Sequence, residues 1–160
     1  MSICEQLQQQ LDRLPDGAEL PAPQLIQVDG DGFQLTCEIA GVGTLGCAVN
    51  YLTVKSERLA GSTTDQLKSQ AEHLASKLTY LLEPVVPIEI DSEGCAVQLR
   101  SNPPHCENDE RSYYELLLHR GGELSLRRYR QKHNECREPV SAQLTREVLG
   151  RLAGDLVETP

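Results

Sequence analysis

The stretch that decides the fold is SYYELLLHRGGELSLRRYRQ, residues 112–131. Apolar and polar residues alternate on both sides of the Gly121-Gly122 pair, which is typical of half-buried strands. Two glycines between two such runs predict a two-residue hairpin turn. We therefore expect one antiparallel hairpin, with strands over 112–120 and 123–131.

The rest of the chain predicts five more strands and three helices. The strands are short alternating or apolar runs bounded by turns, over 24–29, 33–39, 47–55, 85–91 and 95–101. The helices have caps and apolar residues at helical spacing, over 2–14, 63–83 and 141–156. The order is α-βββ-α-ββββ-α. Because the strands come in groups joined by short turns, we expect an α+β fold, a mostly antiparallel sheet with helices packed on its face.

A chain of 160 residues suits one domain, over 1–160. Aromatic residues make up only 4%, so the core must consist of Leu, Val, Ile and Ala. The stretch IQVDGDGFQLTCE (26–38) resembles IEIDSEGCAVQLR (88–100), and LASKL (74–78) resembles LAGDL (152–156). These pairs indicate an internal duplication with half-repeats 24–83 and 85–157 behind the N-terminal helix 2–14. Chance similarity between two β-turn-β-helix runs is the alternative.

The charge of the chain limits its partners. A formal net charge of −9 and a pI near 4.9 argue against nucleic acid and anionic membranes, which bind clustered Lys and Arg. The N-terminus has neither the basic nor the apolar region of a signal peptide, and no apolar run approaches the roughly 20 residues of a membrane helix. We expect a cytoplasmic protein whose six cysteines are mostly free thiols.

Both ends of the predicted hairpin carry metal-binding residue types. With Arg120 facing Glu123, continued pairing would bring two His-Cys segments together at the hairpin base. Two thiolates and two imidazoles could hold zinc in a tetrahedral site. A reversible Cys106–Cys136 disulfide and a polar loop without any bond are the alternatives. The four residues are His105, Cys106, His133 and Cys136.

The second strand of this hairpin contains the one basic cluster of the acidic chain. A strip of cations could dock an acidic peptide or protein partner. Alternatively, this strand lies at the edge of the sheet, where charge prevents unwanted pairing. The cluster consists of Arg127, Arg128, Arg130 and Lys132.

The remaining motifs argue against an enzyme and predict no cofactor. GVGTLG (41–46) matches a dinucleotide-binding pattern, but the strand-like CAVNYLTVK follows where a helix is needed, so we expect a hairpin turn. Cys37 and Cys47 would lie side by side as small core residues. The remaining acids and histidines fit solvated turns and surfaces better than a catalytic site: Asp29, Asp31, Asp91, Glu93, His73 and His119.

The order α-βββ-α-ββ-α in a small acidic chain resembles the type III secretion chaperone-like fold. That superfamily also contains small bacterial and cyanobacterial regulator-like domains. The resemblance covers nearly the whole chain as element order, with the hairpin over 112–131 as an addition. It implies a homodimer that presents apolar surface to an extended client segment, and it transfers no site residues. We therefore expect a non-enzymatic protein-binding adaptor or chaperone-like module, and the alternative is a redox- or zinc-responsive regulator that uses Cys106 and Cys136.

Overall fold

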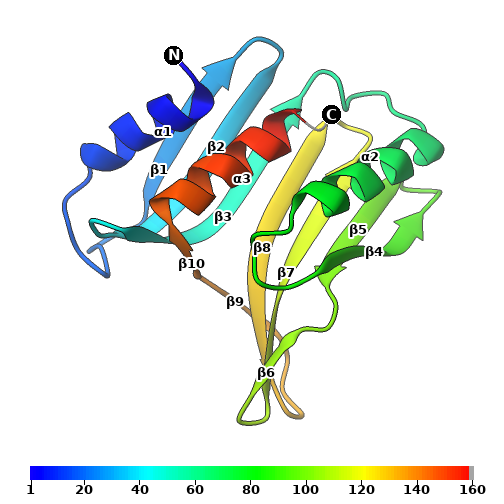
Figure 1. Cartoon of the computed structure of the whole chain (residues 1–160). Coiled ribbons are helices and arrows are strands. Elements are labelled where there is room, and N and C mark those ends of the chain that lie inside the picture. The colour runs from blue at the N-terminus through cyan, green and yellow to red at the C-terminus, as the bar shows by residue number, and fades with distance from the viewer. Residues whose placement is uncertain (159–160) are drawn as a thin grey trace.

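A computed structural model describes residues 1–158 and shows one antiparallel sheet with all three helices on one of its faces (Figure 1). The seven expected strands are present, which confirms the α+β fold. They are β1 (Gln24–Gly30), β2 (Phe33–Val42), β3 (Gly46–Ser56), β4 (Val85–Asp91), β5 (Ala96–Ser101), β7 (Glu110–His119) and β8 (Glu123–Lys132). Their order across the sheet is β1-β2-β3-β8-β7-β5-β4.

Helices α1 (Ile3–Asp12), α2 (Thr64–Lys77) and α3 (Arg146–Glu158) begin close to sequence signals. Capping boxes at Ser2 and Thr63 satisfy the first free N–H groups of α1 and α2. Helix α2 packs on β4 and β5, whereas α3 packs on α1 and β3. The expected helix over 63–83 ends earlier, at Lys77, but Leu78 and Leu81 beyond it are still buried.

The core lies between the sheet and the helices and is rich in leucine, as the scarcity of aromatic residues predicts. One row of cross-strand neighbours runs through five strands, and no member is more than 1% exposed: Cys37, Leu52, Leu126, Leu116 and Leu99. Side chains alternate between the two faces along each strand, so the residues between these core positions face away from the helices.

The structure contains three short strands that the sequence patterns did not predict. They are β6 (His105–Glu107), β9 (Glu138–Val140) and β10 (Ala142–Thr145). Strand β6 folds back on β7 through Asn108 and Asp109, both with positive φ. Strands β9 and β10 belong to one segment that pairs first with β8 and then with β3.

The last helix therefore begins five residues later than expected. The Ser141 hydroxyl donates a hydrogen bond to Asn50 instead of capping a helix. The cap is Thr145, whose hydroxyl accepts a hydrogen bond from the backbone N–H of Val148 at 3.1 Å.

The central hairpin has a longer loop than two glycines suggest. His119 pairs with Glu123, so the loop contains three residues and the register differs by one from the expected register. Gly122, at φ +98°, supplies the left-handed residue of this loop. The interpretation of β8 as an edge strand is wrong, because β8 pairs with β7 on one side and with β3 on the other.

The sequence repeat corresponds to the two outermost hairpins. Strands β1–β2 and β4–β5 lie at opposite ends of the sheet. Gln27 pairs with Thr36, and Glu89 pairs with Gln98, so near their turns the two hairpins share a register at the offset of the repeat, up to the irregularity between Pro87 and Glu89. The two halves of the described chain contribute to one continuous sheet and one core. Within this part of the chain, every helix falls short of the length and apolar character that crossing a membrane requires.

Candidate functional site

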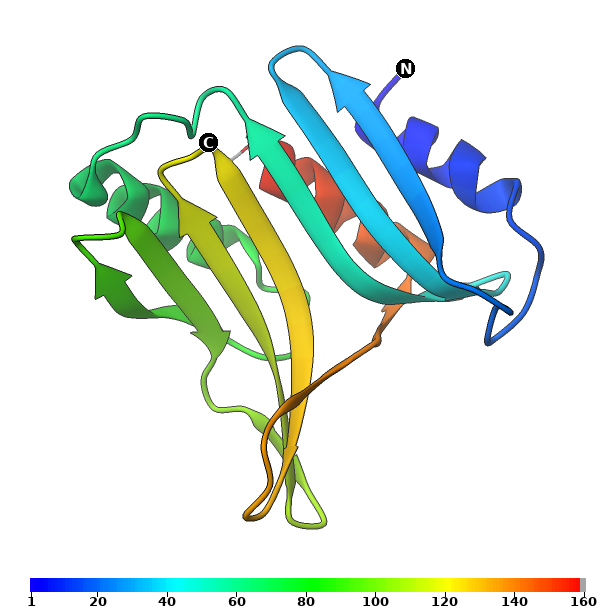
Figure 2. The same ribbon diagram turned by 180° about the vertical axis from the view of Figure 1, so that it is seen from behind.

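No helix among residues 1–158 covers the face of the sheet opposite α1, α2 and α3 (Figure 2). We call this face the open face. Strand alternation sends every second side chain to it. On β7 these residues include Arg111, Tyr113 and Glu115, whereas Leu116 and Leu118 point into the core. Antiparallel sheets commonly keep one face in solvent. Packing of the core therefore does not determine which residues occupy the open face.

A charged row crosses the open face over four neighbouring strands. Arg100 on β5 pairs with Glu115 on β7, and Glu115 pairs with Arg127 on β8. Arg127 in turn pairs with Tyr51 on β3. Directly opposed side chains in an antiparallel sheet are about 5 Å apart, so the row is continuous.

Three tyrosine rings on this face lie beneath guanidinium groups. Tyr113 is only 4% exposed although no helix covers it. Guanidinium groups attract the electron-rich ring faces. The arginine side chains thereby cover these ring faces, and their positively charged guanidinium groups lie above the rings. The three pairs are Arg100 over Tyr113 at 4.7 Å, Arg127 over Tyr51 at 4.8 Å and Arg137 over Tyr129 at 4.0 Å.

Arg137 reaches the row from the segment between β8 and β9. It donates to the carboxylate of Glu115 and to the hydroxyl of Tyr113, and these bonds, the one to Tyr113 first, raise the pKa of Arg137. Arg100 also contacts Glu115, at 3.4 Å. The side chain of Glu115 is 15% exposed. One nearly buried carboxylate therefore holds two arginines in place without neutralising the face.

We call the set Arg100, Arg111, Arg127 and Arg137 the arginine face. Glu38 on β2 and Glu89 on β4 lie beyond its two ends, and Glu38 accepts a hydrogen bond from Asn50. Four arginines around one central glutamate form a cationic surface on a chain with a net charge of −9.

The structure separates the four cations that the sequence grouped on one strand. Only Arg127 lies on the open face. Arg128 points to the other face, where it forms a 2.9 Å ion pair with Glu83 and lies over the Tyr114 ring. Arg130 pairs with Glu138 and Lys132 with Glu110, also on that side. Alternation thus divides a continuous sequence run into a surface residue and structural ion pairs.

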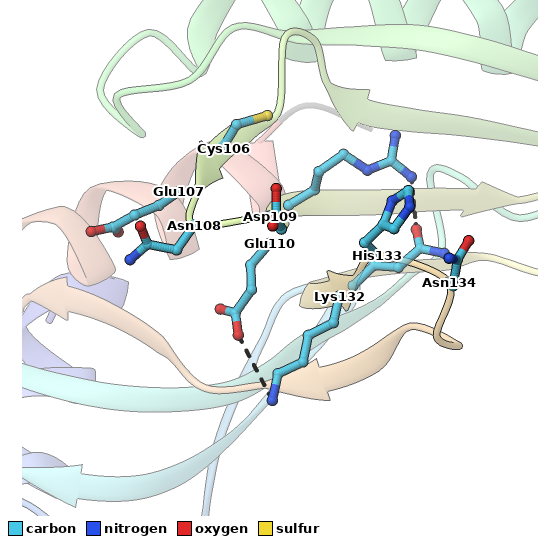
Figure 3. Close-up of a pocket in the computed structure, with 10 residues that line it drawn as sticks. Cys106, Glu107, Asn108, Asp109, Glu110, Lys132, His133 and Asn134 are labelled. Carbon is cyan, nitrogen blue, oxygen red and sulfur yellow. Dashed lines mark hydrogen bonds and ion pairs between the residues drawn. The ribbon is translucent and has the colours of Figure 1, made fainter.

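Two residues of the predicted zinc set, Cys106 and His133, line a cavity of about 510 Å³ (Figure 3), whereas His105 and Cys136 do not belong to its lining. Cys106 pairs with Arg111 across the β6–β7 hairpin, because the turn at Asn108-Asp109 reverses the chain. His105 contacts Glu107 at 3.5 Å. Cys106 and Cys136 are exposed free thiols. Within residues 1–158, no group of three or more His, Cys, Asp or Glu side chains could hold a metal ion, so the zinc set stays a prediction.

The other motifs occupy structural positions. GVGTLG forms the turn between β2 and β3, with a strand rather than a helix after it. Cys37 and Cys47 are buried as expected, but they face Leu52 and Val42 and not each other. Burial raises the pKa of both thiols, that of Cys47 to about 11. In the turn between β4 and β5, the Asp91 carboxylate accepts a hydrogen bond from the backbone N–H of Gly94.

No motif in the sequence marks Arg100, Arg111 and Arg137 as site residues. Arg100 and Arg127 are 27 positions apart and meet only through the pairing of β5, β7 and β8. The alternation in SYYEL and RRYRQ was the available signal, since it places tyrosines and charged residues on the side opposite the leucines. Comparison of the chain with family models, curated proteins and solved structures gives no match.

Proposed function

We propose that this protein is a non-enzymatic protein-binding module that receives an acidic, extended segment of a partner protein on its arginine face. The observation that carries the proposal is the clustering of four arginines on the uncovered side of the sheet of an acidic chain. Electrostatic complementarity of this kind speeds encounter and selects among partners.

The geometry favours a peptide over nucleic acid. Single-stranded nucleic acids bind by stacking bases on exposed aromatic rings inside a basic groove. Here arginines cover Tyr51, Tyr113 and Tyr129, so their near faces are not free for bases. The net charge of −9 would also repel a long polyanion, whereas a short acidic segment meets mainly the local positive surface.

The sheet face suits such a segment better than the sheet edges. A partner strand could in principle add to β4 or β1, the two terminal strands. However, β4 carries Glu89 and Asp91, and β1 carries Asp29. These carboxylates would repel an acidic strand, so the attractive surface lies across the middle of the sheet.

The proposal differs from the client-binding mode that the chaperone-like resemblance implies. Apart from Ile88 and Ile90, which share β4, the large exposed apolar side chains are spread over different strands, loops and the N-terminus: Met1, Leu25, Leu45, Leu82 and Leu117. A binding site for an apolar client needs a contiguous patch. The arginine face is contiguous, and its guanidinium groups suit carboxylates.

A titration with a fluorescein-labelled peptide of alternating Glu and Thr tests the proposal, with anisotropy as the readout. We expect binding that weakens as salt rises, and no binding of a Lys-Thr peptide. R127Q should weaken binding about three- to tenfold, because an exposed charge pair contributes on the order of 1 kcal/mol. R58Q removes the same charge from an exposed loop position and should leave affinity unchanged. Equal affinities of R127Q and R58Q, or no binding of the Glu-Thr peptide at low salt, would refute the proposal.

A further inference from the structure

A second, smaller cavity opens beside the arginine face, between the middle of β4, the end of β5 and the start of β7. It encloses about 220 Å³ and is lined by Ile88, Arg100, Ser101, Asn102, Pro104, Arg111 and Tyr113. Sites for drug-sized ligands usually enclose about 300–1,000 Å³. This cavity is therefore of a size for one side chain or a small ion.

The charge of the cavity is of one sign. Among residues 1–158, its lining contains two arginines and no carboxylate, and Glu115 contacts Arg100 at 3.4 Å from outside the lining. The larger cavity in Figure 3 differs in this respect, since Glu107, Asp109 and Glu110 line it together with Arg111 and Lys132. An anion that enters the smaller cavity meets no acidic lining residue.

Arg100 has unused donor capacity at this position. Its Nε–H is buried and has no hydrogen-bond partner among the residues that the structure describes. Its contact with Glu115, at 3.4 Å, is long for a charge-assisted bond. A buried donor without a partner costs free energy, which favours any arrangement of the Arg100 side chain that brings this N–H to an acceptor.

The second arginine is held beside the first. Arg111 donates through Nη2 to the side-chain oxygen of Gln131 at 2.8 Å, which leaves the rest of its guanidinium group for another acceptor. Both arginines thus line one cavity together with the apolar residues Ile88 and Pro104. Guanidinium groups recognise oxyanions through paired, planar hydrogen bonds.

We infer that this cavity is an oxyanion subsite that receives one side-chain carboxylate of the acidic segment. The inference rests on the proposed function, since Arg100 belongs both to the cavity and to the arginine face. The subsite would fix the register of a segment that the rest of the face holds only by distributed charge.

The test uses the full chain labelled with ¹⁵N and follows the arginine Nε–H resonances by NMR during titration with sodium acetate at constant ionic strength. We expect a saturable shift of the Arg100 resonance, and R111Q should weaken acetate binding about tenfold. R58Q is the matched control and should behave as the wild type does. Absence of a saturable shift, or an unchanged shift in R111Q, would overturn the inference.

Two further results separate this inference from the proposed function. A parallel titration with sodium phosphate distinguishes the anion source, because saturation by phosphate alone would overturn the carboxylate assignment. If the Glu-Thr peptide binds but acetate does not shift Arg100, the subsite fails and the proposed function stands. If acetate binds and the peptide does not, the proposed function fails and the cavity is an anion site of another kind.

Discussion

The neighbouring residues Arg127 and Arg128 should respond to the same substitution in opposite ways. The side chain of Arg128 is 15% exposed and pairs at 2.9 Å with Glu83, which is 13% exposed. R128Q leaves the Glu83 carboxylate almost buried without its cation. Breaking a fully buried ion pair in this way costs about 3–5 kcal/mol. Because both groups keep some exposure, we expect R128Q to lower the free energy of unfolding by about 2–4 kcal/mol. We expect its affinity for the Glu-Thr peptide to stay the same.

R127Q should instead preserve stability and lose affinity. Arg127 is exposed, and its contact with the Tyr51 ring contributes about 0.5–1 kcal/mol. Urea denaturation followed by circular dichroism measures both variants. In thermal melts we expect R128Q to lower Tm by roughly 5–15 °C and R127Q by less than about 4 °C, since 1 kcal/mol corresponds to about 2–4 °C for a chain of this length.

A double-mutant cycle isolates the ion pair. E83Q should be destabilised to a similar extent as R128Q, because it leaves a cation without its partner. The double variant E83Q/R128Q contains no orphaned charge, so its loss should be smaller than the sum of the two single losses by about 1–3 kcal/mol. Additive losses, or a loss below about 1 kcal/mol in R128Q, would show that the pair is solvated and would refute the assignment of Arg128 to structure.

Three further predictions concern the scaffold. G41A should destabilise the fold by about 1–3 kcal/mol, since a Cβ there would lie 2.1 Å from the carbonyl oxygen of Ala18. G154A should stabilise the fold by about 0.5–1 kcal/mol, because a Cβ on this residue of α3 would meet no atom within 4 Å. Equal effects of the two variants in urea melts would contradict this contrast. T145A should cost about 1 kcal/mol through loss of the α3 cap, and an unchanged Tm would argue against that cap. The folded pKa of the Cys47 thiol, about 11, lies above its ordinary value of 9.0, so its contribution to stability should be complete below pH 9 and decline as pH rises toward 11; C47V should reduce this decline in urea melts, and an identical pH profile would contradict it.

Local sequence patterns predicted most of the architecture, because strand alternation and helix caps depend on residues that are close together in the chain. Leu116 and Leu118 alternate with Glu115 and Leu117, and the capping box at Thr63 marks the start of α2. The failures arise where a residue satisfies two patterns. Ser141 is a good cap type that bonds Asn50 instead, and Asn108-Asp109 forms a turn inside a stretch that reads as a polar loop.

The candidate site depended on register, and register is a property of strand pairs. A two-residue turn at Gly121-Gly122 would have aligned Arg120 with Glu123, but the three-residue loop aligns His119 with Glu123. Each register determines which residues of β7 and β8 are opposed, so an error of one residue changes every cross-strand neighbour. Arg137 is harder still to predict, since it reaches Glu115 from an irregular segment.

The separation of cations between the two faces explains how an acidic protein can have a basic surface. Arg128 and Arg130 form ion pairs with acids on the side of the helices, so they add no free charge there. On the open face, Arg127 has no direct ion pair among the described residues, and Arg100 and Arg137 share the single carboxylate of Glu115. Within about a Debye length, roughly 10 Å at 0.1 M salt, a ligand therefore meets the local arginines rather than the net charge of the chain. The proposed specificity follows from this distance dependence: an acidic segment short enough to lie within the face is attracted, and a longer polyanion is repelled by the rest of the molecule.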